Sequence, residues 1–124
     1  METDASSLPA LATALRNGDR TVRATVDGCL DRITAIEDDV RAWVDGPKPR
    51  VWLQSEATAL AERYPDPETR PPLYGVPVGV KDIFHVDGLP TRAGSTLPPG
   101  ALAGRQAALV TTYARRGRSS SARR

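Results

Sequence analysis

The feature that most restricts the fold is one short run of alternating valines. Val76, Val78 and Val80 lie in the segment GVPVGV, which begins at Gly75, and Lys81 follows directly. β-Branched residues favour strands, and an apolar run bounded by Gly and Pro is typical of a strand buried between helices. A parallel sheet needs neighbouring strands and cover on both faces. One such segment in 124 residues therefore predicts an α/β protein whose sheet is incomplete.

Helical spacing dominates the chain before this run. Apolar residues recur three and four positions apart after Ser7 and again after Thr21, and both residues are good helix N-caps. The predicted helices run from Ser7 to about Gly18, from Thr21 to about residue 38 and, more weakly, from Val51 to Arg63. We therefore expect residues 1–70 to form an amino-terminal helical segment, followed by a loop-rich core region at residues 71–112.

Charge is distributed unevenly along the chain. Residues 1–87 carry 10 Lys and Arg against 15 Asp and Glu, a net charge of −5, whereas residues 88–124 carry 7 Arg and no acid, a net charge of +7. The Arg- and Ser-rich tail at residues 113–124 is a compositional signal for nucleic-acid binding, because arginines neutralise phosphates without needing a fold. One interpretation is therefore a small helical interaction module, with residues 7–63 as the interface and a basic tail that contacts a polyanion.

The chain has one Cys and one His, which limits its chemistry. Cys29 cannot form an internal disulfide, and with His85 it cannot supply the usual nitrogen and sulfur ligands of a zinc site. We interpret His85 as a surface loop residue, and we expect no metal and no cofactor. No stretch approaches the roughly 18 uninterrupted apolar residues of a membrane span. These features predict a cytoplasmic protein without a membrane partner, and they leave the oligomeric state open.

Two linked motifs connect the valine run to a known family. Residues 75–82 read GVPVGVKD, and residues 88–95 read GLPTRAGS. Together they resemble the amidase signature hydrolases, whose first core strand reads approximately G-V-P-[IV]-x-V-K-D and continues to G-[LMT]-P-T-x-x-G-S. The resemblance covers roughly residues 7–112, which corresponds to the first quarter or so of a typical family member.

The resemblance implies a Ser–cis-Ser–Lys triad that hydrolyses small-molecule amides, in which Lys81 matches the lysine. A serine hydroxyl becomes a good nucleophile only when a base removes its proton, and a lysine serves as that base only when its pKa is lowered by burial. The surroundings that we expect to bury Lys81 are apolar and come from Val78, Val80, Ile83 and Phe84. Lys81 is thus the candidate catalytic residue.

The two serines of such a triad have no counterpart in this chain. In the family they lie in a later Gly- and Ser-rich stretch of the type G-G-S-S-G-G, whereas Ser119–Ser121 have no flanking glycines that would let backbone N–H groups converge on an oxyanion. Ser95 belongs to the lysine-side motif. We therefore predict that the chain is the amino-terminal portion of an amidase, inactive on its own.

The resemblance stops near Thr112, and the codons suggest why. The family would continue in the sense of LRAAGAVVVG-[KT]-T, but residues 112–124 read TYARRGRSSSARR. We back-translate residues 112–124 into codons with free third bases and shift the reading frame by one nucleotide. The shifted codons can then encode LRAAGAVVVGTT when the free third bases are chosen suitably. We therefore predict a frameshift near Thr112. An out-of-frame tail owes its arginines to GC-rich codons, which argues against nucleic-acid binding.

Overall fold

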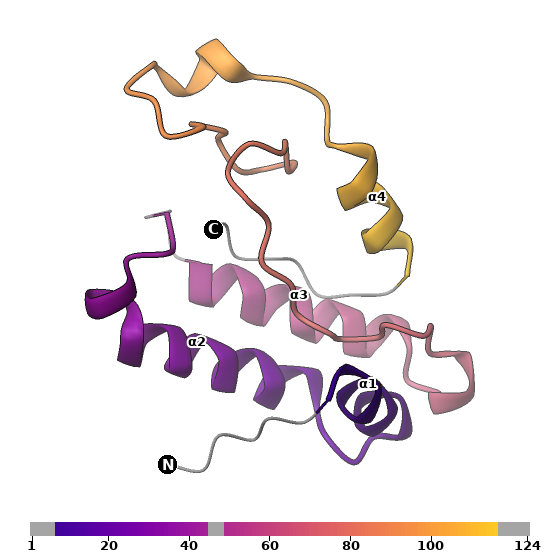
Figure 1. Ribbon diagram of the computed structural model, residues 1–124. Coiled ribbons are helices and arrows are strands. Elements are labelled where there is room, and N and C mark those ends of the chain that lie inside the picture. The colour runs from indigo at the N-terminus through magenta and orange to yellow at the C-terminus, as the bar shows by residue number, and fades with distance from the viewer. Residues whose placement is uncertain (1–6, 45–48, 117–124) are drawn as a thin grey trace.

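The computed structural model describes residues 7–44 and 49–116. Three helices pack into a helical unit, and residues 77–116, which we call the arch, rise on one side of it (Figure 1). The elements in chain order are α1 (Leu8–Asn17), α2 (Val22–Val40), α3 (Pro49–Arg63), the 3-10 turns η1 (Pro67–Thr69) and η2 (Pro99–Leu102), and α4 (Ala108–Arg115). The first six residues, residues 45–48 and most of the basic tail, residues 117–124, lie outside the described residues.

The first two helices begin and end where local groups satisfy the free backbone atoms. The Ser7 Oγ accepts a hydrogen bond from the N–H three residues on (3.4 Å), and the Thr21 Oγ1 does the same at 3.1 Å. These bonds occupy N–H groups that a first helical turn leaves without partners. Gly18 ends α1 with a left-handed φ of 84°, as glycine does readily. Both predicted helices are confirmed, and α2 continues to Val40.

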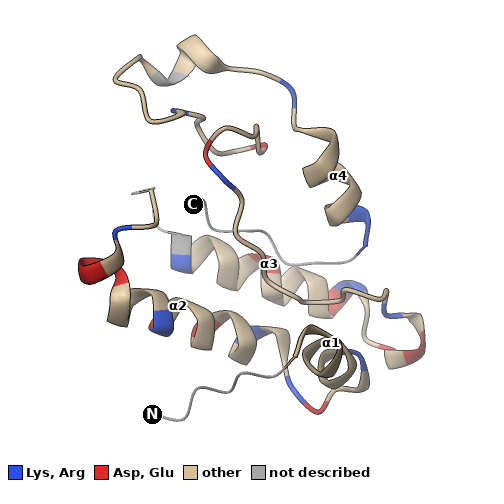
Figure 2. Ribbon diagram, in the orientation of Figure 1, with Lys and Arg blue, Asp and Glu red and all other residues tan. Residues whose placement is uncertain are grey.

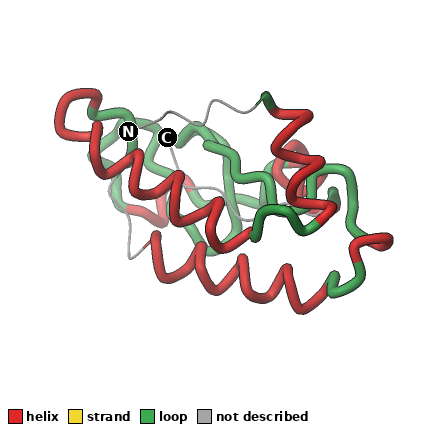
Figure 3. Tube along the Cα trace, turned by 90° about the horizontal axis from the view of Figure 1, so that it is seen from below, coloured by secondary structure: helices red, strands yellow, loops and turns green. Residues whose placement is uncertain are grey.

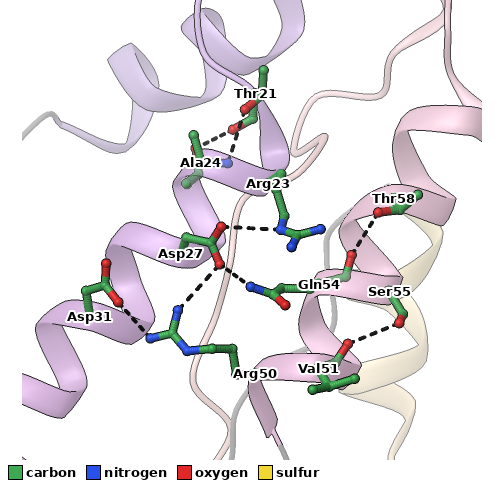
Figure 4. A network of polar contacts seen from close by, with 11 residues as sticks. Thr21, Arg23, Ala24, Asp27, Asp31, Arg50, Val51, Gln54, Ser55 and Thr58 are labelled. Carbon is green, nitrogen blue, oxygen red and sulfur yellow. Dashed lines mark hydrogen bonds and ion pairs between the residues drawn. The ribbon is translucent and has the colours of Figure 1, made fainter.

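A polar network joins α2 to α3 (Figure 4). The Asp27 carboxylate accepts hydrogen bonds from Gln54 Nε2 (2.6 Å), Arg23 Nε (3.3 Å) and Arg50 Nη1 (3.5 Å), and Arg50 Nη2 also donates to Asp31 (2.7 Å). The bond from Gln54 lowers the pKa of Asp27 most, partial burial opposes it, and the Arg23 hydrogen bond and the charges of Arg23 and Arg50 lower it further. Because water screens these exposed charges, the network fixes the register of the two helices more than it adds stability.

The helical unit has its own hydrophobic core, and α2 and α3 lie side by side in both views (Figures 1 and 3). Leu15 and Val26 are the largest side chains that are fully buried. The buried members of this cluster are Ala12, Leu15, Val22, Val26, Leu30, Leu53, Ala57, Leu60, Tyr74 and Val76. Tyr74 and Val76 follow the third helix, so the segment that leads into the arch is anchored in the same core.

Arg70 ties the chain after α3 to the end of α1. Its Nη1 donates to the carbonyl oxygens of Leu15 (3.2 Å) and Arg16 (3.1 Å), its Nε donates to that of Tyr64 (3.1 Å), and its guanidinium lies 4.6 Å from the centre of the Tyr74 ring. The last carbonyls of a helix have no partner within the helix. A cation at this end also interacts favourably with the helix dipole. Arg70 therefore completes the C-terminus of α1 from 54 residues away along the chain.

Gly75 is the position in this unit where a side chain fits least well. Its φ is 72°, and a Cβ atom would lie 2.5 Å from Val22 Cγ2. We expect Gly75→Ala to lower the free energy of unfolding by about 3 kcal/mol, because left-handed strain and overpacking of Val22 add together. Urea unfolding followed by circular dichroism measures this.

Gly18→Ala is the matched control for that substitution. Gly18 has nearly the same φ, 84°, but an added Cβ would meet only Arg70 Nη1 at an ordinary 3.5 Å. It should therefore lose only the conformational part, about 1 kcal/mol. Equal losses at the two glycines would show that the contact with Val22 adds nothing.

The strand that the valine run predicts is not formed. Residues 76–79 are irregular, and no strand occurs within residues 7–44 and 49–116. Isolated bridge positions occur there at Val80 and between Val86 and Leu89, where the bridge closes a turn. The physical reason is that a strand is stabilised by hydrogen bonds to a neighbouring strand, so β propensity alone does not assemble one. The expected core strand is therefore not formed among the described residues, and they contain no sheet.

Candidate active site

Lys81 is the first residue of a turn near the start of the arch. Its carbonyl oxygen accepts a hydrogen bond from the Phe84 N–H (3.1 Å), and its side chain is exposed. The prediction that apolar neighbours bury this amine is wrong for the chain as described: Val80 is 9% exposed, but Ile83 and Phe84 are 52% and 36% exposed. The same missing sheet explains this, because a strand end is buried only when other elements cover it.

Asp82 connects the two sequence motifs that carry the family resemblance. It is 7% exposed, its carboxylate accepts a hydrogen bond from the Arg92 N–H (3.2 Å), and its carbonyl oxygen accepts one from the Ala93 N–H (3.0 Å). A buried carboxylate needs such donors to offset its desolvation. The motifs at residues 75–82 and 88–95 are therefore in contact in space, and Asp82 contributes to that contact.

His85 lies in a loop, as interpreted from the sequence, but its side chain also makes structural contacts. It is half-buried, and its Nδ1 lies 2.9 Å from the hydroxyl of Thr91, which is 6% exposed. Its carbonyl oxygen accepts a hydrogen bond from the Ala107 N–H (2.9 Å). A Cβ atom at Gly104 would lie 2.6 Å from the imidazole Nε2, so only glycine allows the backbone to approach the ring this closely. His85 thus holds the loop after Lys81 against the segment that leads into α4.

The described residues show neither the side-chain grouping of a metal site nor a helix that could span a membrane. Within the described ranges, no group of three His, Cys, Asp or Glu side chains has the arrangement of a metal site. None of the helices in this part of the chain is both long enough and apolar enough to cross a bilayer. The serines placed here have local partners: the Ser7 Oγ caps α1, the Ser55 Oγ donates to the Val51 carbonyl, and the Ser95 Oγ accepts from the Leu97 N–H.

Comparison of the sequence with known proteins gives one family. The family model described as Amidase matches residues 24–120, which extends past Thr112, where the motif comparison predicts the resemblance to end. A similar curated protein is a glutamyl-tRNA(Gln) amidotransferase subunit from Chloroflexus aggregans, 35% identical over 99 residues. That match covers 76% of this chain but 19% of the relative, so the chain spans about a fifth of the length of this relative.

Solved structures show that the backbone is shared as well. The crystal structure of an amidase superposes on 95% of this chain with a TM-score of 0.77 and 32% identity, and the match covers 26% of that amidase chain. The peptide amidase of Stenotrophomonas maltophilia superposes on 94% of this chain with a TM-score of 0.79 at 23% identity. The helical unit and the arch together therefore have the backbone of part of an amidase fold. On these matches of sequence and backbone, the chain belongs to the amidase family.

Proposed function

We propose that this chain is the amino-terminal part of an amide hydrolase and that Lys81 is the lysine of its Ser–cis-Ser–Lys triad. The observation that carries the proposal is the contact between the two family motifs: Asp82, next to Lys81, accepts hydrogen bonds from the backbone of Arg92 and Ala93. Residues of the second motif thus fix the backbone that carries the amine. The substrate class is a carboxamide, and no cofactor takes part.

The chemistry of the proposed centre follows from proton transfer. A neutral Lys81 Nζ accepts the proton of the nucleophilic serine through a bridging serine hydroxyl, and the serine oxygen then attacks the carbonyl carbon. The tetrahedral intermediate collapses to an acyl-serine when the C–N bond breaks and the amine leaves with a proton. Water then hydrolyses the ester. Backbone N–H groups stabilise the oxyanion in both steps.

The chain of 124 residues supplies only one member of this centre. The Lys81 side chain is exposed, and the hydroxyls of Ser7, Ser55 and Ser95 are engaged in local hydrogen bonds. The chain also contains no G-G-S-S-G-G stretch that could form an oxyanion site. We therefore also propose that the 124-residue polypeptide has no amidase activity of its own.

The proposed organisation of the chain follows the reading frame. Residues 1–70 form the helical segment, residues 71–112 begin the catalytic core, and residues 113–124 are read out of frame. In the shifted frame the codons after residue 112 can encode LRAAGAVVVGTT, a helical stretch, a glycine and an apolar β-branched run. Such a run following α4 is the pattern of a second buried parallel strand.

The test of this proposal has two steps. The nucleotide sequence across codons 108–124 should show an open shifted frame that encodes the amidase continuation, and the protein read in that frame (the frame-restored protein) should release ammonia from a simple carboxamide. The 124-residue chain should release none above background under the same conditions. An interrupted shifted frame would contradict the frameshift, and turnover by the 124-residue chain that requires Lys81 would contradict the proposed inactivity.

A further inference from the structure

We propose that the arch binds, without a covalent link, an amidase-fold polypeptide that lacks its own amino-terminal part. The contact surface on the arch, which we call the arch surface, consists of the side chains of Ile83, Phe84, Leu97 and Leu109, which are 52%, 36%, 53% and 51% exposed. The inference rests on the proposed function only in taking the chain for the amino-terminal part of such a fold.

The arch has a much smaller buried apolar cluster than the helical unit. The buried cluster of the arch consists of Val80, Val86 and Val110, whereas the cluster of the helical unit has ten members. A cluster of three valines is far below the core that an independent domain needs. The arch therefore requires cover from outside its own residues.

The arch surface has the chemistry of a buried interface. Each of these four large apolar side chains is exposed by a third or more, in a segment of about 30 residues whose own buried cluster is small. The described part of the arch carries few charged residues compared with the three helices beneath it (Figure 2). Depletion of charge around apolar anchors is typical of the centre of a protein–protein contact.

The comparison structures indicate which occupant fits. This chain shares the backbone of an amidase over 95% of its length, arch included, but that match covers 26% of the amidase chain. The remaining part of such a fold is therefore the occupant that we propose for the arch surface. It would also offer a sheet edge to residues 76–80, whose valines favour a strand but are not assigned to one here. A second copy of this chain offers no such edge among its described residues.

The probe is the Chloroflexus aggregans amidotransferase subunit from which the matched 99-residue segment has been removed (the trimmed relative). The full 124-residue chain carries an affinity tag and is co-expressed with the trimmed relative, and complexes are measured by light scattering after size-exclusion chromatography. We expect a 1:1 complex. Ile83→Glu and Leu109→Glu should each weaken it by roughly 10-fold or more, because each places an unpaired charge in an apolar contact.

Val51→Glu is the matched control, because Val51 is 61% exposed on α3 and lies outside the arch. It should leave the complex unchanged, and all three variants should retain the helical circular dichroism of the parent. Recovery of the tagged chain alone, with the trimmed relative insoluble, overturns the inference. Self-association of the chain that Leu109→Glu abolishes overturns it in favour of a second copy.

The same preparation separates this inference from the proposed function. A 1:1 complex that releases no ammonia from a carboxamide counts against the proposed function and leaves the docking inference intact. Absence of the complex overturns the docking inference alone, because the proposed function is tested on the continuous frame-restored protein.

Discussion

Lys81→Met in the frame-restored protein is expected to lower kcat/KM for a simple carboxamide by about 10⁴-fold. Methionine has nearly the length and volume of lysine, so the substitution keeps the packing and removes only the amine. Without that amine nothing accepts the serine proton, and the residual rate comes from binding and oxyanion contacts. Ammonia release under substrate-limited conditions measures the effect.

Arg105→Met is the matched control for this substitution. Arg105 is exposed on the arch and its replacement also removes one positive charge. It should change kcat/KM by no more than about twofold, because exposed charges away from the reacting atoms contribute little. Full activity in the Lys81→Met protein would exclude Lys81 as the base, whatever the fate of the other proposals.

Leu15→Ala is expected to lower the free energy of unfolding of the 124-residue chain by about 3–5 kcal/mol. Leu15 has 0% of its surface exposed and lies in the core of the helical unit. Removing its methyl groups leaves a cavity, and small domains have only about 5 kcal/mol in total to lose. The helical signal at 222 nm should therefore be largely lost at low urea concentrations.

Leu8→Ala provides the comparison on the same helix. Leu8 is 56% exposed in the first turn of α1, so its truncation removes little buried surface. The expected loss is within about 0.5 kcal/mol, as for most surface substitutions. Similar losses for Leu8 and Leu15 would show that α1 does not pack in solution as it does here.

The helices were predictable because their signals are local. The apolar spacing after Ser7 and Thr21 fixes which face of each helix is buried, and both hydroxyls cap the helices that they precede. The absence of a strand at residues 76–80 could not be predicted from the valines alone, because strand formation depends on a neighbour elsewhere in the chain. The same valines find different surroundings here, with Val76 in the core of the helical unit and Val80 in the cluster of the arch.

The sequence motif nominates Lys81 as a candidate site residue, but it does not predict the surroundings of that side chain. Lys81 is identified as a candidate by the motif GVPVGVKD, but the exposure of its side chain depends on elements that the motif does not encode. The contact of His85 with Thr91 and Gly104 has no sequence pattern, since it joins residues 6 and 19 positions apart across an irregular loop. A glycine after a long loop with few charged residues, such as Gly104, was the available hint of a close backbone approach.

The position of Arg70 has a consequence for synthesis on the ribosome. Its guanidinium meets the carbonyl oxygens of Leu15 and Arg16, which are translated 55 and 54 residues earlier. Until Arg70 has left the exit tunnel, the end of α1 lacks this cation, and the Tyr74 and Val76 side chains of the core are also missing. A nascent chain can therefore complete this helical unit only after all three helices and residues 70–76 have emerged.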